Sequence, residues 1–102
     1  SDQKIIPIID DHKSLIGIVD FEEVKAVIFN PNHVKFMTMS EIMGQPKEII
    51  LFEDKPEKIM KLFEASKTTI LPVIHKGKYF GFLSKIDVLE SYRHRLKEMI
   101  IE

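Results

Sequence analysis

Hydrophobic residues in this chain come in short β-branched runs separated by polar turns. Residues 5–9 and 15–19 form two such runs, and they predict a hairpin of two strands. Residues 70–74 and 79–83 repeat the arrangement around a shorter turn. Because the apolar residues are consecutive in the returning strands, residues 15–19 and 79–83, we expect these two strands to be buried on both faces.

The two hairpins belong to an internal repeat that continues into the segments after them. Pro7 aligns with Pro72 and Gly17 aligns with Gly81, and the second copy is one residue shorter in its turn. Two short apolar runs often align by chance, whereas a proline, a turn, a glycine and a following helix rarely do so together. We therefore predict two structural copies of one unit.

A helix is expected to begin at the same place in both copies. Ser84 and Asp20 each stand three residues before an acid, which is the spacing of a capping box. After Ser84 the apolar residues recur at steps of three and four, which predicts an amphipathic helix running to about residue 101. The helix after Asp20 is shorter, and Asn30-Pro31 is expected to end it.

The residues between the two copies complete the second unit but not the first. Residues 48–52 predict a strand, and a helix opens near Asp54 and ends near Ser66. The first unit lacks an equivalent opening strand and helix, which would need about twenty residues before Ser1. We predict an α/β (α+β) chain made of tandem β-α-β-β-α repeats, the first without its opening strand and helix. Its parts are a partial first repeat at residues 1–36, a linker at 37–47 and a complete second repeat at 48–102.

Composition and charge exclude several classes of function. The formal net charge of -1 argues against a nucleic-acid-binding protein, which would carry an excess of basic residues. The chain has no cysteine, so it has no disulfide framework and no thiolate nucleophile, and a cytosolic setting is favoured. Its apolar runs span about five residues, whereas a membrane crossing needs about twenty, and no secretory signal opens the sequence. We expect these residues to form a soluble domain.

The sequence carries none of the common catalytic or metal-binding motifs. It has no G-x-G-x-x-G, no P-loop and no H-E-x-x-H, and no serine has the partners of a catalytic triad. Its four histidines lack the spacing of metal ligands. We therefore predict a protein without a catalytic or metal site. The basic residues 93–97 indicate a solvated helix face, with a docking surface for a membrane domain or anionic lipid as the alternative.

The tandem repeat and its motifs resemble the CBS domain pair, a regulatory module named after cystathionine β-synthase. The motifs are the hydrophobic-x-Pro strands, the GFLSKID segment at residues 81–87 and the linker residues Ser40-Glu41-Ile42-Met43. The first copy departs from the pattern in GIVDFEE at residues 17–23, where Asp20 replaces the usual serine or threonine. The resemblance covers essentially the whole chain.

A narrower resemblance links residues 24–43 and 81–96 to the cytoplasmic C-terminal CBS pair of bacterial CLC-type chloride channels and transporters. The elements that carry it are Phe29-Asn30-Pro31 and the E-x-Y-R-x-x-L pattern at residues 90–96. This resemblance implies a non-catalytic regulatory module at the cytoplasmic face of the membrane, attached to the transmembrane chloride-transport domain of a channel or chloride/proton antiporter. Two alternatives stay open: a structural dimerisation module that binds no ligand, and the regulatory CBS pair of a metabolic enzyme.

The family resemblance also implies a binding site for an adenine nucleotide between the two repeats. ATP, ADP and AMP are the candidate regulatory ligands, and no cofactor is required. A carboxylate can accept both ribose hydroxyls, and a helix N-terminus with a nearby lysine can hold phosphate. By this resemblance Asp87 holds the ribose, Ser84 and Lys85 lie near the phosphate, and Ile5, Ile6 and Pro7 flank the adenine.

The alternative is that Ser84 and Asp87 only cap a helix. In the first copy, Asp20, Glu22 and Glu23 crowd acids at the helix start, which disfavours a second phosphate there.

A homodimer is also expected. A half-complete first repeat leaves apolar strand and helix surface that a chain of this length cannot cover alone, and CBS pairs characteristically dimerise through their helices. Candidate residues for this contact or for the core are Val24, Val27, Ile28, Ile59 and Phe63.

Overall fold

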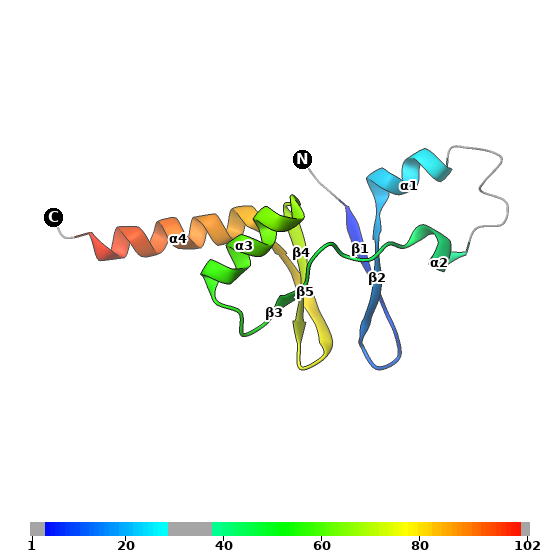
Figure 1. Ribbon diagram of the computed structural model, residues 1–102, viewed down its shortest axis with the longest axis horizontal. Helices are drawn as coiled ribbons and strands as arrows, with labels where there is room; N and C mark the ends of the chain where they lie inside the picture. Colours follow the sequence, from blue (N-terminus) through cyan, green and yellow to red (C-terminus); the bar gives the residue numbers. More distant parts are fainter. Residues whose placement is uncertain (1–3, 29–37, 101–102) are drawn as a thin grey trace. The chain divides into compact units, whose positions relative to one another are not determined.

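The computed structural model describes residues 4–28 and 38–100 and divides the chain into two compact units, residues 1–46 and residues 47–102 (Figure 1). Each unit combines a small β-sheet with helices, so the predicted mixed α+β fold is confirmed. The elements of the first unit are β1 (Ile5–Ile9), β2 (Leu15–Asp20), α1 (Phe21–Ile28) and α2 (Met39–Ile42). Those of the second are β3 (Ile50–Leu51), α3 (Pro56–Ser66), β4 (Ile70–His75), β5 (Lys78–Ser84) and α4 (Lys85–Met99).

In the first unit, β1 and β2 form an antiparallel hairpin, and the chain after α2 returns along the other edge of β2. Ile18 and Gly44 exchange two backbone hydrogen bonds of 2.8 Å. The side-chain amide of Gln45 donates a further hydrogen bond of 2.9 Å to the carbonyl oxygen of Ile16. These bonds make residues 43–46 part of the first unit, while the outer edge of β1 pairs with no other described strand.

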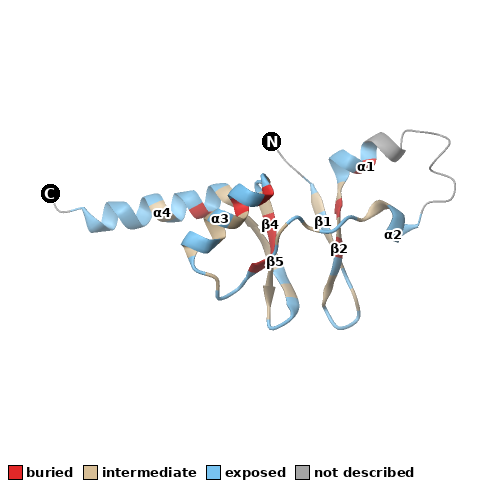
Figure 2. Cartoon of the chain, in the orientation of Figure 1, coloured by how far each residue is buried: buried red, intermediate tan, exposed pale blue. Residues whose placement is uncertain are grey.

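In the second unit, β4 lies between β3, which runs parallel to it, and β5, which runs antiparallel. Helices α3 and α4 pack against this sheet and close a core (Figure 2). Burial of these apolar side chains is the main stabilising term of the unit. The core residues are Ile50, Phe63, Leu71 and Val88, with Ile59, Met60, Leu62, Val73, Leu83 and Tyr92 packed against them.

The internal repeat predicted from the sequence extends to the pairing register of the two hairpins. Pro7 lies opposite Ile18, and its counterpart Pro72 lies opposite Phe82. Both hairpins have a β-bulge directly before the aligned glycines, where one residue of the returning strand lies opposite no residue of the first strand. These two bulged residues are Ile16 and Phe80.

The first residue of each following helix is held in the same way in both units. The backbone N–H of Phe21 donates to the carbonyl of Lys4 at 3.0 Å, and that of Lys85 donates to the carbonyl of Thr69 at 2.8 Å. Strand start and helix start are therefore neighbours within each unit, and the two units share this geometry.

Two expectations about the elements were wrong in detail. The returning strands are not buried on both faces: Ile16 and Phe80 are exposed by 41% and 61%, because no described element covers these side chains. The strand predicted at residues 48–52 is shorter, because Leu51 and Asp54 exchange two hydrogen bonds of 2.8 Å that turn the chain. Asp54 therefore holds this turn, and α3 begins two residues later.

The aligned glycines Gly17 and Gly81 differ in packing, and this difference tests the close approach of residues 43–44 to β2. A Cβ at Gly17 would lie 2.7 Å from the Met43 sulfur and 3.1 Å from the Gly44 carbonyl oxygen, whereas a Cβ at Gly81 would meet no atom within 4 Å. We expect Gly17→Ala to destabilise the first unit by about 1–3 kcal/mol through overpacking. Gly81→Ala is the matched control and should change the free energy of unfolding by less than about 1 kcal/mol.

Urea denaturation followed by circular dichroism checks this pair of substitutions. Equal stability of the two variants would contradict the close approach of residues 43–44 to β2.

Candidate functional site

The start of α4 brings three of the predicted site residues together. Ser84 is the N-cap residue, and its hydroxyl oxygen accepts a hydrogen bond of 3.2 Å from the backbone N–H of Asp87. Lys85 and Asp87 then lie in the first helical turn, so the predicted cap at Ser84 is confirmed. Two amides of this turn are already used, since Lys85 N–H binds Thr69. An anion approaching this helix end would therefore meet the N–H of Ile86.

The Asp87 carboxylate is free to bind a ligand. Asp87 is exposed, and none of the ion pairs within residues 4–28 and 38–100 involves Asp87 or Lys85. An ionised carboxylate only accepts hydrogen bonds, and it can accept from two hydroxyls at once. Lys85, two residues before it in the same first turn, supplies a cation. These groups suit a ligand that carries a diol and an anionic group.

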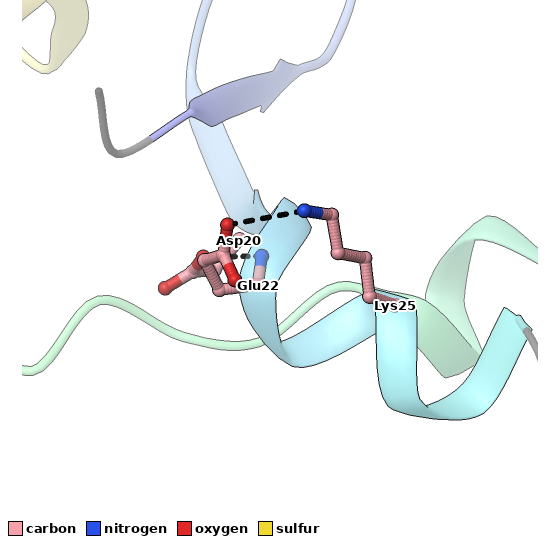
Figure 3. A network of polar contacts seen from close by, with 3 residues as sticks. All are labelled: Asp20, Glu22 and Lys25. Atoms are coloured by element: carbon pink, nitrogen blue, oxygen red, sulfur yellow. Dashed lines mark hydrogen bonds and ion pairs between the residues drawn. The ribbon is translucent and has the colours of Figure 1, made fainter. Parts of the chain in front are cut away.

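The corresponding helix start in the first unit has a different charge pattern. Asp20 accepts a hydrogen bond of 3.0 Å from the N–H of Glu22, the second helical residue, so its side chain caps the start of this helix. The Lys25 ammonium lies 3.4 Å from the Glu22 carboxylate (Figure 3). Acids still outnumber cations here, whereas Lys85 and Asp87 balance at the start of α4. An anionic ligand is therefore favoured in the second unit only.

The predicted adenine-flanking residues lie on β1 in the first unit. Ile5 and Pro7 are half-buried and Ile6 is exposed. The structure describes the two units separately, so the meeting of these side chains with Asp87 stays a prediction.

Thr69 belongs to the site and was missed by the sequence analysis. Its carbonyl holds the first amide of α4, which places Thr69 directly beside Ser84 and Lys85. The available signal was the repeat itself, because Thr69 takes the place of Lys4 when the two hairpins are superposed by register.

We also looked in the described part of the chain for metal-binding groups, membrane-spanning helices and side chains with a shifted pKa. Residues 4–28 and 38–100 contain no group of three or more metal-ligating side chains. No described helix combines the length and the apolar character needed to cross a bilayer. Burial raises the pKa of the Tyr79 hydroxyl above its usual value near 10.0, so that side chain stays neutral at physiological pH.

An aromatic cluster at the far end of β5 lies apart from the start of α4. The rings of Phe52 and His75 are 4.3 Å apart and those of Phe52 and Phe80 are 4.9 Å apart. The cluster packs the tip of the hairpin, and no charged partner of His75 is found there among the described residues.

No family model matches the sequence. Solved structures do match it, and three of them are 21% identical to this chain. CBSX2 in complex with AMP matches with a TM-score of 0.72 over 90% of this chain and 72% of its own. A putative acetoin utilization protein, AcuB from Vibrio cholerae, matches with 0.72 over 94% and 71%. The cytosolic domain of the Mg2+ channel MgtE in complex with ATP matches with 0.71 over 88% and 34%.

These matches show the fold alone, because a sequence identity of 21% does not establish a shared function. The chain has the fold of CBS-domain proteins, as its proline, glycine and helix-start motifs predicted. None of the three is described as a CLC protein, so the narrower resemblance stays a prediction.

Proposed function

We propose that this chain is a non-catalytic regulatory module that binds an adenine nucleotide at the start of α4. The observation that carries the proposal is the exposed Asp87 carboxylate, which has no ion-pair partner in the described chain and stands in the first turn of a capped helix beside Lys85. Two of the structures with the same fold are complexes with AMP or ATP, which supports a nucleotide as the ligand.

Each polar group has a distinct role in the proposed complex. The Asp87 carboxylate accepts hydrogen bonds from the two ribose hydroxyls. The Lys85 ammonium and the Ile86 N–H, at the positive end of the helix dipole, stabilise the phosphate. The adenine ring lies against Ile5, Ile6 and Pro7 of the first unit. The acids at the start of α1 disfavour a second nucleotide there, so the stoichiometry is one nucleotide per chain.

The wider assignment is that the module regulates an attached CLC-type chloride-transport domain at the cytoplasmic face of the membrane. The sequence patterns at residues 24–43 and 81–96 support it. A regulatory CBS pair of a metabolic enzyme has the same fold and is the competing assignment. The segment that precedes these residues in the full-length protein separates the two, since a run of apolar spans supports the first and a soluble catalytic domain supports the second.

Calorimetric titration tests the nucleotide proposal. ATP, ADP, AMP and adenosine are titrated separately into the chain at ligand concentrations up to about 1 mM, which detects binding as weak as about -4 kcal/mol. We expect heat with at least one nucleotide at one site per chain, and weaker binding of adenosine because it lacks the phosphate. The absence of heat with all four would leave a structural module that binds no nucleotide.

A further inference from the structure

The outer edge of β5 pairs with no other described strand, although the corresponding edge of β2 in the first unit is occupied. β2 and β5 are the returning strands of two hairpins with the same register, so their edges can be compared residue by residue. Pro7 faces Ile18 in the first hairpin, and Pro72 faces Phe82 in the second. Ile18 and Phe82 therefore hold equivalent positions on the two edges.

In the first unit, the chain after α2 shows how this edge binds an extended segment (Figure 1). Gly44 and Ile18 exchange two backbone hydrogen bonds of 2.8 Å, so Ile18 directs both of its backbone groups away from β1. Facing residues of antiparallel strands alternate between bonded and non-bonded pairs, and a proline cannot donate in either. Because Pro72 faces Phe82 in the same register, the N–H and C=O of Phe82 also point to the open edge. Such an edge is a template for an added strand.

A hollow beside this edge is filled in the first unit and open in the second. A Cβ at Gly17 would lie 2.7 Å from the sulfur of Met43, so the methionine occupies the space above this glycine. A Cβ at Gly81, the equivalent glycine of β5, would meet no atom within 4 Å. Gly17 is accordingly buried, and Gly81 is half-buried. Two residues further on, Val19 is buried and Leu83 is half-buried.

We propose that the free edge of β5 binds an extended segment of a partner polypeptide in which a methionine is followed by a glycine. The segment adds to the sheet antiparallel to β5, and its glycine exchanges two backbone hydrogen bonds with Phe82. The methionine fills the hollow above Gly81, since an unbranched thioether adapts well to such a gap. A glutamine after the glycine donates its amide to the carbonyl of Phe80, as Gln45 does to that of Ile16 at 2.9 Å.

The occupant is a separate polypeptide because the chain's own copy of the motif is already in use. Residues 42–45 read Ile-Met-Gly-Gln, and they are bound to β2 through the two backbone bonds of Gly44 and the side-chain bond of Gln45. A second copy of the chain could supply the motif only by breaking these bonds. The inference is also independent of the proposed nucleotide, because residues 80–82 are not assigned to it and the tests are made without it.

Hydrogen exchange of the chain alone tests whether the edge is open. The N–H of Phe82 points away from the sheet and should exchange at least about tenfold faster than that of Leu83, which faces Leu71 in the alternate, bonded type of pair. Two-dimensional ¹⁵N–¹H NMR reads both amides in one experiment. A Phe82 amide as slow as that of Leu83 would overturn the inference, because the edge would already be covered.

A synthetic peptide with the sequence of residues 40–46, blocked at both ends, tests binding to this edge. Added at up to about 5 mM, which detects a Kd in the millimolar range, it should progressively shift the amides of Gly81 and Phe82. It should also slow exchange of the Phe82 amide at least about twofold. A control peptide with proline in place of its glycine lacks one N–H and should bind at least about tenfold more weakly. The absence of shifts with the first peptide would reject the docking edge.

Gly81→Ala tests the hollow separately from the fold. The added Cβ meets no atom in the free chain, but it would occupy the place of the peptide's methionine, as a Cβ at Gly17 would crowd Met43. We expect this variant to keep wild-type stability and to bind the peptide at least about tenfold more weakly. Ser91→Ala, at an exposed position on α4, is the control and should bind as the wild type does. Equal affinity of Gly81→Ala and the wild type would place the peptide elsewhere and overturn the inference.

Discussion

Replacing Phe63 by alanine is expected to lower the free energy of unfolding by about 3–5 kcal/mol, the largest single effect in the second unit. Phe63 is 1% exposed and packs in α3 against a core that also contains Ile50 and Val88. Its loss removes the transfer free energy of the ring and leaves a cavity in this core. Because small domains are stable by only about 5–15 kcal/mol, the variant should unfold at markedly lower urea concentration.

Phe80→Ala is the matched control for this substitution. Phe80 is mostly exposed, and its ring lies against those of Phe52 and His75. Loss of such ring contacts typically costs about 0.5–1.5 kcal/mol. Urea denaturation of both variants separates the two environments. A loss at Phe80 as large as that at Phe63 would mean that the exposed face of β5 is covered in solution.

The second large effect concerns binding. Asp87→Asn should weaken nucleotide affinity by roughly ten- to a hundredfold, because removing a charged acceptor typically costs about 1.5–3 kcal/mol. Asparagine keeps the size of the side chain, and the Asp87 N–H that Ser84 caps is a backbone group, so the cap survives the change. Calorimetry with the tightest-binding nucleotide provides the measurement.

One control accompanies this substitution. Glu90→Gln removes a carboxylate from the same helix at an exposed position outside the predicted site and should leave nucleotide affinity unchanged. Binding that is insensitive to Asp87→Asn would retain the ligand but reject Asp87 as its ribose contact.

The fold was predictable because its signals are local and occur twice. The hydrophobic-x-Pro strands, the glycines and the helix starts recur at matching positions, and the structure reproduces them with the same hairpin register. Burial could not be predicted in the same way, because consecutive apolar residues do not reveal which element covers a strand. The capping-box spacing at Asp20 likewise did not specify which amide its side chain binds. An aspartate can accept from either of two neighbouring N–H groups, and only the backbone geometry selects one.

The site was predictable only where one segment supplies it. Ser84, Lys85 and Asp87 come from a single helix start, so their proximity follows from the spacing of the motif. Thr69 reaches Lys85 through a contact between residues far apart in the sequence, and only the alignment of the two repeats could have indicated it. The predicted contact of Ile5, Ile6 and Pro7 with the adenine also depends on how distant segments pack, which no spacing within one segment indicates.

The most direct test of nucleotide binding at this position is a titration of AMP followed by two-dimensional ¹⁵N–¹H NMR, which reports on each backbone amide separately. The account predicts progressive shifts of the amides of Lys85, Ile86 and Asp87, accompanied by those of Ile5 and Ile6, while the amides of Glu22 and Glu23 stay unchanged. No shift at the start of α4 with AMP at about 5 mM, or shifts confined to the start of α1, would contradict it.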